Sequence, residues 1–95
     1  MKIQVEFLGL PALSGIIGKK TSVDLSGVTM TDLFVHLVRQ FGPEVRQSLL
    51  ASDGKLDPTI QAMVNDEGFV PRDLLAQKTL QEGDTVKFLL LAGGG

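Results

Sequence analysis

A single amphipathic helix, expected over residues 30–41, constrains the fold of this chain more than any other feature. Thr29 is a favourable N-cap, and the Asp32 carboxylate is placed to stabilise the helix N-terminus. Gly42 and Pro43 end the pattern. The apolar side chains recur at the i, i+3, i+4, i+7 spacing of a helix with one buried face, and they are Met30, Leu33, Phe34, Leu37, Val38 and Phe41.

Segments with the two-residue period of half-buried strands lie on both sides of this helix. We expect strands over residues 2–7, 20–25, 60–64 and 86–90, with the first two forming an antiparallel pair. In the last of these, Val86, Phe88 and Leu90 share one face. The predicted core comprises Ile3, Val5, Phe7, Val23, Leu33, Leu37, Val38, Ile60, Val64, Val86 and Phe88.

The connecting segments carry weaker patterns. Residues 10–18 are predicted to be an extended loop punctuated by Gly15 and Gly18, and residues 44–50 a short helical turn. Residues 69–70 have the composition of a short edge strand that Pro71 stops. Leu74, Leu75 and Leu80 are expected to anchor the segment that follows.

Composition excludes several functional classes. The 95 residues carry a net charge of −2, and 43% of them are hydrophobic, which is typical of one globular domain. Basic residues are scattered, which argues against a nucleic-acid partner. The absence of cysteine removes disulfides, thiolate metal sites and cysteine nucleophiles. No apolar run has membrane-spanning length and no signal pattern begins the sequence, so we expect a cytoplasmic protein with no membrane partner.

No motif of a self-contained catalytic site is present. The phosphate-binding patterns GxxxxGK[ST] and GxGxxG and the nucleophile pattern GxSxG are absent. His36 lies off the apolar stripe of the helix and is interpreted as a surface residue rather than a metal ligand. Asp66 and Glu67 are interpreted as part of a solvated turn. We therefore expect no metal site and no bound cofactor.

The final residues are the most unusual part of the sequence. The last strand pattern stops at Leu91, and Ala92 is followed by Gly93, Gly94 and Gly95. A segment with so little side-chain bulk can enter a narrow channel in another protein. Residues 91–95 in extended conformation span about 17 Å. From this pattern we predict that the reactive group of the protein is the carboxylate of Gly95. The alternatives are a frayed end, a truncated linker or a residual tag sequence.

The order of these elements resembles that of the β-grasp, or ubiquitin-like, fold of the α+β class. Thr29–Phe34 at the helix start, Met63–Asp66 at the end of the third strand, Leu80–Val86 before the tail and the terminal Gly94–Gly95 together resemble the MoaD/ThiS family of small sulfur carriers. The resemblance implies a mixed sheet of four or five strands, with parallel first and last strands at its centre and the helix across one face. It divides the chain into a β-grasp domain, residues 1–91, and a flexible glycine tail, residues 92–95.

The resemblance also implies a carrier rather than an enzyme. In such proteins an E1-like enzyme uses ATP to adenylate the terminal carboxylate, and a sulfur donor converts the product into a thiocarboxylate. The functional pair is then Gly94–Gly95, with Gly93 as an extra spacer. The sulfur acceptor is expected to be a synthase such as the large subunit of molybdopterin synthase. The length of the chain favours molybdenum or tungsten cofactor synthesis, and related carriers serve thiamine or cysteine synthesis.

The strand register predicts where partners bind. Leu8, Met63, Leu89 and Leu91 fall on the face of the sheet away from the helix, and we expect them to dock a partner together with Ala92 and Gly93 of the tail. Two other functions remain open: a ubiquitin-like modifier conjugated through Gly95, and a non-catalytic interaction domain with an inert tail.

Overall fold

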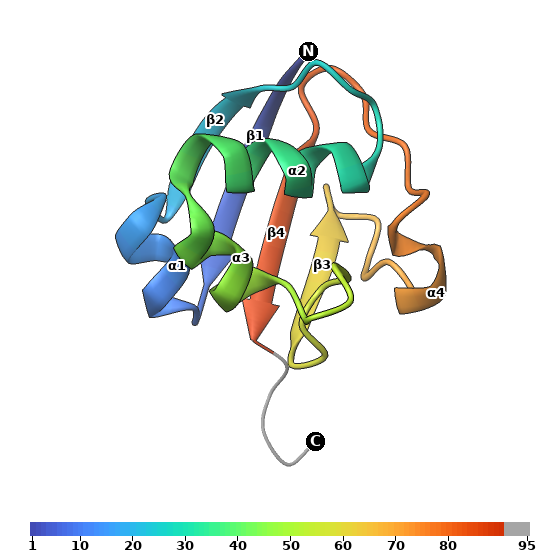
Figure 1. The fold of residues 1–95 in the computed structure, drawn as a ribbon. Helices are drawn as coiled ribbons and strands as arrows, with labels where there is room; N and C mark the ends of the chain where they lie inside the picture. The colour runs from blue at the N-terminus through green and yellow to red at the C-terminus, as the bar shows by residue number, and fades with distance from the viewer. Residues whose placement is uncertain (91–95) are drawn as a thin grey trace.

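A mixed sheet of four strands in the order β2-β1-β4-β3 forms the centre of the fold. The structure is a computed structural model and describes residues 1–90. The central strands, β1 (Lys2–Leu8) and β4 (Thr85–Leu90), are parallel. The edge strands, β2 (Lys20–Asp24) and β3 (Ile60–Val64), each pair antiparallel with their neighbour (Figure 1). Both predictions about strand direction, for the first two strands and for the first and last, are confirmed.

Helix α2 (Met30–Phe41) crosses one face of the sheet, as predicted (Figure 1). Its first turn is closed by a capping box, in which Thr29 Oγ1 accepts from the Asp32 N–H at 3.2 Å. The Asp32 carboxylate accepts from the Thr29 N–H at 3.0 Å and from the Val28 N–H at 2.9 Å. The helix ends at Phe41 with Gly42 as its C-cap, and Pro43 begins helix α3 (Pro43–Leu49). The stop signal in the sequence therefore separates two helices.

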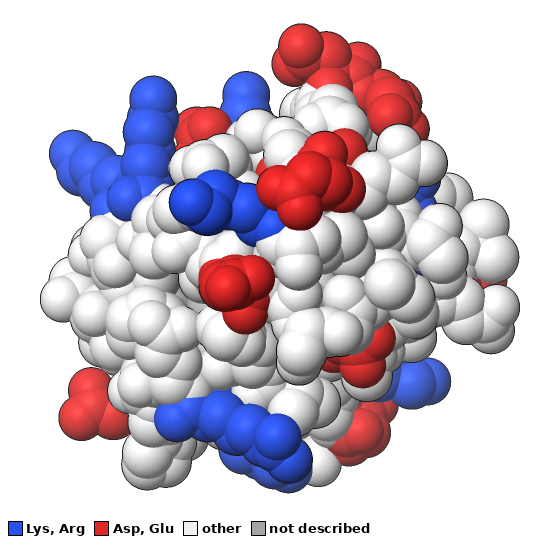
Figure 2. All heavy atoms as spheres, turned by 90° about the horizontal axis from the view of Figure 1, so that it is seen from above, with Lys and Arg blue, Asp and Glu red and all other residues white. Residues whose placement is uncertain are grey.

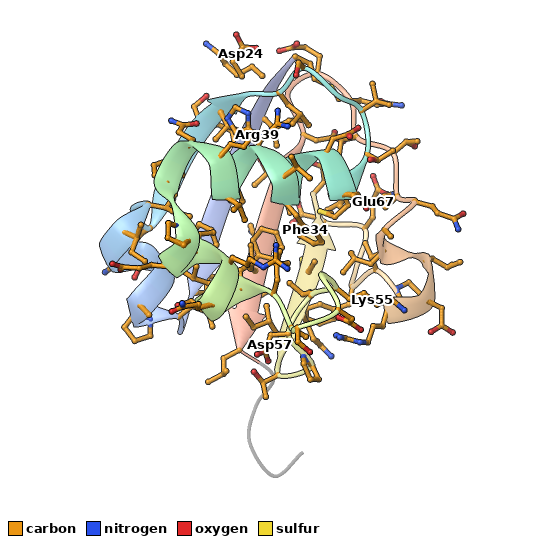
Figure 3. The ribbon with its side chains drawn as sticks, viewed as in Figure 1. Asp24, Phe34, Arg39, Lys55, Asp57 and Glu67 are labelled. Carbon is orange, nitrogen blue, oxygen red and sulfur yellow. The ribbon has the colours of Figure 1, made fainter. Side chains whose placement is uncertain are left out.

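The core lies between the sheet and the helices and centres on stacked aromatic rings. Phe7 and Phe88 are direct neighbours on the two parallel strands, with ring centroids 5.5 Å apart. Phe34 of α2 approaches Phe88 from the helix side at 6.1 Å (Figure 3). Every residue of the predicted core is buried except Val38, which is half-buried and packs against the edge of the core.

The segment predicted as an extended loop over residues 10–18 contains a short helix, α1 (Pro11–Ile16), so this prediction is wrong. Proline suits the first turn of a helix because its ring presets φ and no N–H is needed there. Leu13 and Ile17, four residues apart, are both buried on the same side of the turn. Burial of this pair outweighs the weak helix propensity of Gly15.

The segment after β3 also differs from expectation. Residues 69–70 form no strand: Phe69 makes one isolated bridge to Met63, and the Val70 N–H donates to the Ala62 carbonyl at 2.9 Å. Helix α4 (Arg72–Leu75) follows, so the chain turns before a ladder can form. Leu74 is exposed rather than anchoring, because adjacent positions of a one-turn helix point to different sides. Leu75 and Leu80 are buried as expected.

None of the helices in residues 1–90 has the length and apolar character needed to cross a membrane.

Candidate functional site

The end of the central parallel pair brings two predicted site residues together. The register places Leu8 of β1 directly beside Leu89 of β4, and Gln61 of β3 lies on the other side of Leu89. All three project from the outer face, which is the face of the sheet opposite α2. Leu8 is 44% exposed and Leu89 is half-buried. Two leucines on adjacent central strands therefore line the outer face at the end of the sheet where β4 stops.

Met63 lies one row further from this end. It pairs with Lys87 across β3 and β4, which makes it the diagonal neighbour of Leu89. Phe69 lies on the far side of Met63 from β4, because an isolated bridge pairs these two residues. It is 51% exposed. We call Leu8, Leu89, Met63 and Phe69 the outer-face patch. The sequence pattern did not include Phe69, since the bridge that positions it depends on the turn after β3.

Leu90 was predicted on the core face of the last strand, and its pairing with the buried Ile60 confirms that face. It is nevertheless 51% exposed rather than buried, because it is the last residue of β4, at the margin of the sheet. Gly9 lies against it, since a Cβ on Gly9 would be 3.8 Å from the Leu90 Cβ. Leu8, Leu89 and Leu90 therefore form an apolar end to the central strands.

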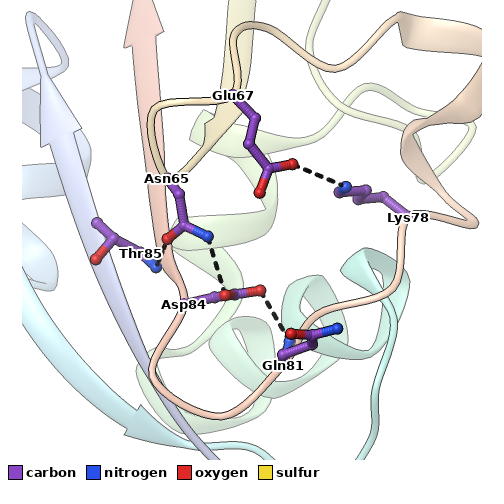
Figure 4. Close-up of polar contacts among 6 residues, drawn as sticks. All are labelled: Asn65, Glu67, Lys78, Gln81, Asp84 and Thr85. Carbon is purple, nitrogen blue, oxygen red and sulfur yellow. Dashed lines mark hydrogen bonds and ion pairs between the residues drawn. The ribbon is translucent and has the colours of Figure 1, made fainter.

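The start of β4, at the opposite end of the strand, is fixed by a polar cluster (Figure 4). Asn65 Nδ2 donates to Asp84 Oδ1 at 3.0 Å, and Asn65 Oδ1 accepts from the Thr85 N–H at 2.9 Å. Asp84 Oδ2 accepts from the Gln81 N–H at 2.8 Å. Asn65 has a positive φ of 54°, a conformation that asparagine tolerates better than most residues. The segments 63–66 and 80–86, which carried the family resemblance, thus position the last strand.

Two carboxyl groups in the described residues have pKa values lowered by local hydrogen bonds. The Thr29 and Val28 N–H groups, with the Thr29 hydroxyl, hold the pKa of Asp32 below its ordinary value. The hydroxyl and N–H of Thr59, at 2.6 and 2.8 Å, do the same for Asp57, which lies near the end of β4 (Figure 3). Both aspartates accept from residues within four positions along the chain, which assigns them to a helix cap and a turn.

The other polar residues considered from sequence take part in surface contacts. His36 Nε2 lies 2.7 Å from Gln40 Oε1 on the exposed side of α2. Glu67 forms an ion pair with Lys78 at 3.7 Å (Figure 4). Within residues 1–90, no group of three or more His, Cys, Asp or Glu side chains is arranged to hold a metal ion. Basic and acidic side chains are interspersed on the face seen in Figure 2.

The remaining predicted site residues, Leu91, Ala92, Gly93, Gly94 and Gly95, lie outside the described residues. The structure does define Leu90, the residue that precedes them. Leu90 ends β4 at the end of the sheet opposite the N-terminus, beside the last residues of β1 and the first of β3 (Figure 1). The chain therefore enters the tail next to the outer-face patch.

Comparison with known proteins finds several solved structures with a similar fold. No protein-family model and no curated protein sequence matches the chain. SAMP1 from Haloferax volcanii is similar with a TM-score of 0.75 and 22% identity over 100% of both chains. A chain of the Amycolatopsis orientalis BexX/CysO complex gives 0.71 and 23% identity, with 98% of this chain and 99% of that chain covered. Urm1 from Trypanosoma brucei gives 0.69 and 27%, over 99% and 95%.

These similarities confirm the β-grasp fold. The similar structures are small ubiquitin-like carrier and modifier proteins of the MoaD/ThiS type, the group that the sequence resembled.

Proposed function

We propose that this chain is a sulfur carrier whose C-terminal glycine is activated by a separate enzyme. An E1-like enzyme binds the outer-face patch and receives Gly94 and Gly95 in its active site, with Leu91, Ala92 and Gly93 in the approach channel. The observation that carries the proposal is the contiguity of the patch with the end of β4: Leu8 and Leu89 are cross-strand neighbours, and only Leu90 and Leu91 separate Leu89 from the tail in sequence. A partner docked on this patch lies beside the entry to the tail.

The proposed chemistry takes place on the tail and uses ATP held by the partner. A carboxylate is a poor electrophile, so the Gly95 carboxylate first attacks the α-phosphorus of ATP and pyrophosphate leaves. A sulfide equivalent from a sulfur donor then attacks the acyl-adenylate, and AMP leaves. The resulting thiocarboxylate is a good nucleophile, which a sulfur-accepting synthase uses. The carrier contributes a rigid domain that directs the enzyme and a thread narrow enough to enter its site.

For the acceptor, we propose the large subunit of a molybdopterin-type synthase, with cysteine or thiamine synthesis as related pathways. Similarity to a chain of the BexX/CysO complex supports a role with a protein partner, since that chain was crystallised in a complex.

Intact-protein mass spectrometry tests the proposal. The full chain is incubated with its activating enzyme, ATP and a sulfur donor, and we expect the mass change of replacing one oxygen by sulfur. Deleting Gly94 and Gly95, or adding one alanine after Gly95, should abolish the change, because the carboxylate no longer reaches the point of attack. Equal modification of the altered chains would place the sulfur elsewhere and overturn the proposal.

A second candidate is a protein modifier, joined through Gly95 to the lysine of a target protein. One of the similar structures is a Haloferax volcanii protein described as small archaeal modifier protein 1, which favours this candidate. The same activated carboxyl group would serve both functions. Recovery of the tagged chain from its native cells distinguishes them: a series of larger covalent adducts indicates a modifier, and a free or thiocarboxylated chain indicates a carrier.

A further inference from the structure

The free edge of β2 presents backbone groups in a regular order. The ladder with β1 includes the bonds from the Phe7 N–H to the Lys19 carbonyl, 2.9 Å, and from the Leu25 N–H to the Met1 carbonyl, 2.7 Å. Because an antiparallel strand alternates the direction of its backbone groups, the odd positions of β2 bond to β1 and the even positions face away. Lys20, Ser22 and Asp24 therefore direct their N–H and C=O groups outward, and none of them takes part in a backbone hydrogen bond outside the ladder within residues 1–90.

The same three residues form a charge pattern with two-fold symmetry. Lys20 and Asp24 lie two positions on either side of Ser22, and all three side chains are exposed on the outer face. On β1, Glu6 is the cross-strand neighbour of Lys20, and Lys2 is the neighbour of Asp24. The Asp24 side chain is 91% exposed, lies 3.6 Å from the amino group of Met1, and is at the N-terminal end of the molecule (Figure 3).

We propose that β2 is a self-association edge and that its partner is a second copy of this chain. In an antiparallel pair centred on Ser22, each Ser22 faces its counterpart, and Lys20 of each copy faces Asp24 of the other. The outward backbone groups of the three residues are then in phase to exchange hydrogen bonds. The two sheets become one continuous sheet, and its two-fold axis at Ser22 makes the interface isologous.

Charge complementarity selects this register. Across the joined sheet, one row reads Glu6 and Lys20 of the first copy and then Asp24 and Lys2 of the second, so opposite charges alternate along it. An in-register parallel arrangement would instead bring Lys20 beside Lys20 and Asp24 beside Asp24, which is unfavourable. A slip by one residue would turn the outward backbone groups out of phase. Charged edge residues usually prevent strand pairing; here they oppose other partners and match a second copy.

The dimer is expected to be weak, because a five-residue strand buries much less surface than a stable interface of about 1,600 Å². The outer-face patch lies on β1 and on the chain segments beyond it, so none of its residues belongs to the joined edge. Self-association through β2 therefore leaves partner docking and the tail free. This inference does not depend on the proposed function.

Sedimentation velocity of the full chain at low ionic strength, up to about 1 mM, tests the proposal, since a weak strand-edge contact corresponds to dissociation constants near that range. We expect reversible dimerisation of the wild type. Asp24→Lys and Lys20→Asp should each weaken it at least about tenfold, because symmetry applies each charge reversal twice. A mixture of the two variants should dimerise again, since the two edge lysines of the first variant then face the two edge aspartates of the second.

The mixture is the decisive measurement. Any effect of a substitution on its own chain is already present when each variant is measured alone. Association that appears only in the mixture must therefore come from contact between the two variants. Asp66→Lys, at an exposed position in the turn after β3, changes net charge as Asp24→Lys does and should leave the dimer unaffected. A wild type that stays monomeric over the whole range, a dimer that tolerates Asp24→Lys, or a mixture that associates no more than its components would each overturn the proposal. Circular dichroism confirms that every variant is folded.

Discussion

At the scale of single residues, the start of α2 is the most closely specified point in the molecule. Asp32 accepts from two N–H groups while its own N–H is bonded to Thr29. Gly27 packs against the same carboxylate: a Cβ at Gly27 would lie 2.2 Å from Asp32 Oδ2. Sequence reasoning identified Thr29 and Asp32 because capping depends on local spacing. It gave no role to Gly27, whose constraint appears only when the chain folds back on Asp32.

Gly27→Ala is therefore expected to destabilise the protein, because the new methyl group displaces the capping carboxylate. Gly15→Ala is the matched substitution: no atom lies within 4 Å of a Cβ there. Since Gly15 is inside α1, alanine should stabilise the fold by about 0.5–1 kcal/mol. Urea unfolding of both variants measures the two effects. A Gly27→Ala variant at least as stable as the wild type would show that the contact with Asp32 has no energetic consequence.

The lowered pKa values of Asp32 and Asp57 give a pH dependence with a definite sign. Each carboxylate is stabilised in the folded state, so its contribution is complete above its unfolded pKa, near 3.8, and is lost as pH falls through the lower folded pKa. Asp32→Asn removes one of these groups. We expect the difference in unfolding free energy between wild type and variant to be largest at pH 7 and to shrink towards about pH 3. A difference that is constant with pH would contradict this assignment.

At the scale of elements, periodicity predicted the four strands and α2 because each has one buried face that repeats along the sequence. Among the elements without such a repeat, α3 was predicted as a short helical turn, whereas α1 and α4 were not predicted. Over residues 10–18, Gly15 and Gly18 indicated a loop, and only the burial of Leu13 and Ile17 against the rest of the fold makes the segment helical. In α4, Arg72 donates hydrogen bonds to the Leu56 and Asp57 carbonyls, far away in sequence. Such contacts leave no periodic signal.

The packing of β1, β4 and α2 around Phe88 gives the prediction for this scale. Phe88 is fully buried and contacts Phe7 and Phe34, so Phe88→Ala leaves a cavity between three elements and should cost about 3–5 kcal/mol. Phe69→Ala removes the same side chain from a position 51% exposed and should cost far less. Denaturant unfolding of both variants gives the comparison. Similar losses would show that the core is not centred on Phe88.

At the scale of the whole molecule, the candidate site was predictable only in part. The two-residue period placed Leu8, Met63 and Leu89 on the outer face, and the structure confirms that placement. It could not find Phe69, which reaches the face through a turn, or show that Leu90 is exposed where β4 ends. The binding role of these residues stays a prediction. Residues 91–95 were predicted as site residues from composition, strand register and the family resemblance, and they lie outside the described residues.

Docking through the outer-face patch predicts that charge substitutions at two exposed apolar residues, on opposite sides of the molecule, affect enzyme binding differently. Leu8 is 44% exposed on the outer face, and Val35 is 46% exposed on α2. Leu8→Glu places a charge beside Leu89, where a docked partner would have to desolvate it, and should weaken binding of the activating enzyme at least about tenfold. Val35→Glu should leave binding unchanged. Because both positions face solvent, neither change should alter the unfolding transition appreciably.

Titration of the activating enzyme with each variant measures the affinities, and mass spectrometry follows thiocarboxylate formation in parallel. Equal affinities would place the docking surface away from the patch even if the glycine tail were still modified.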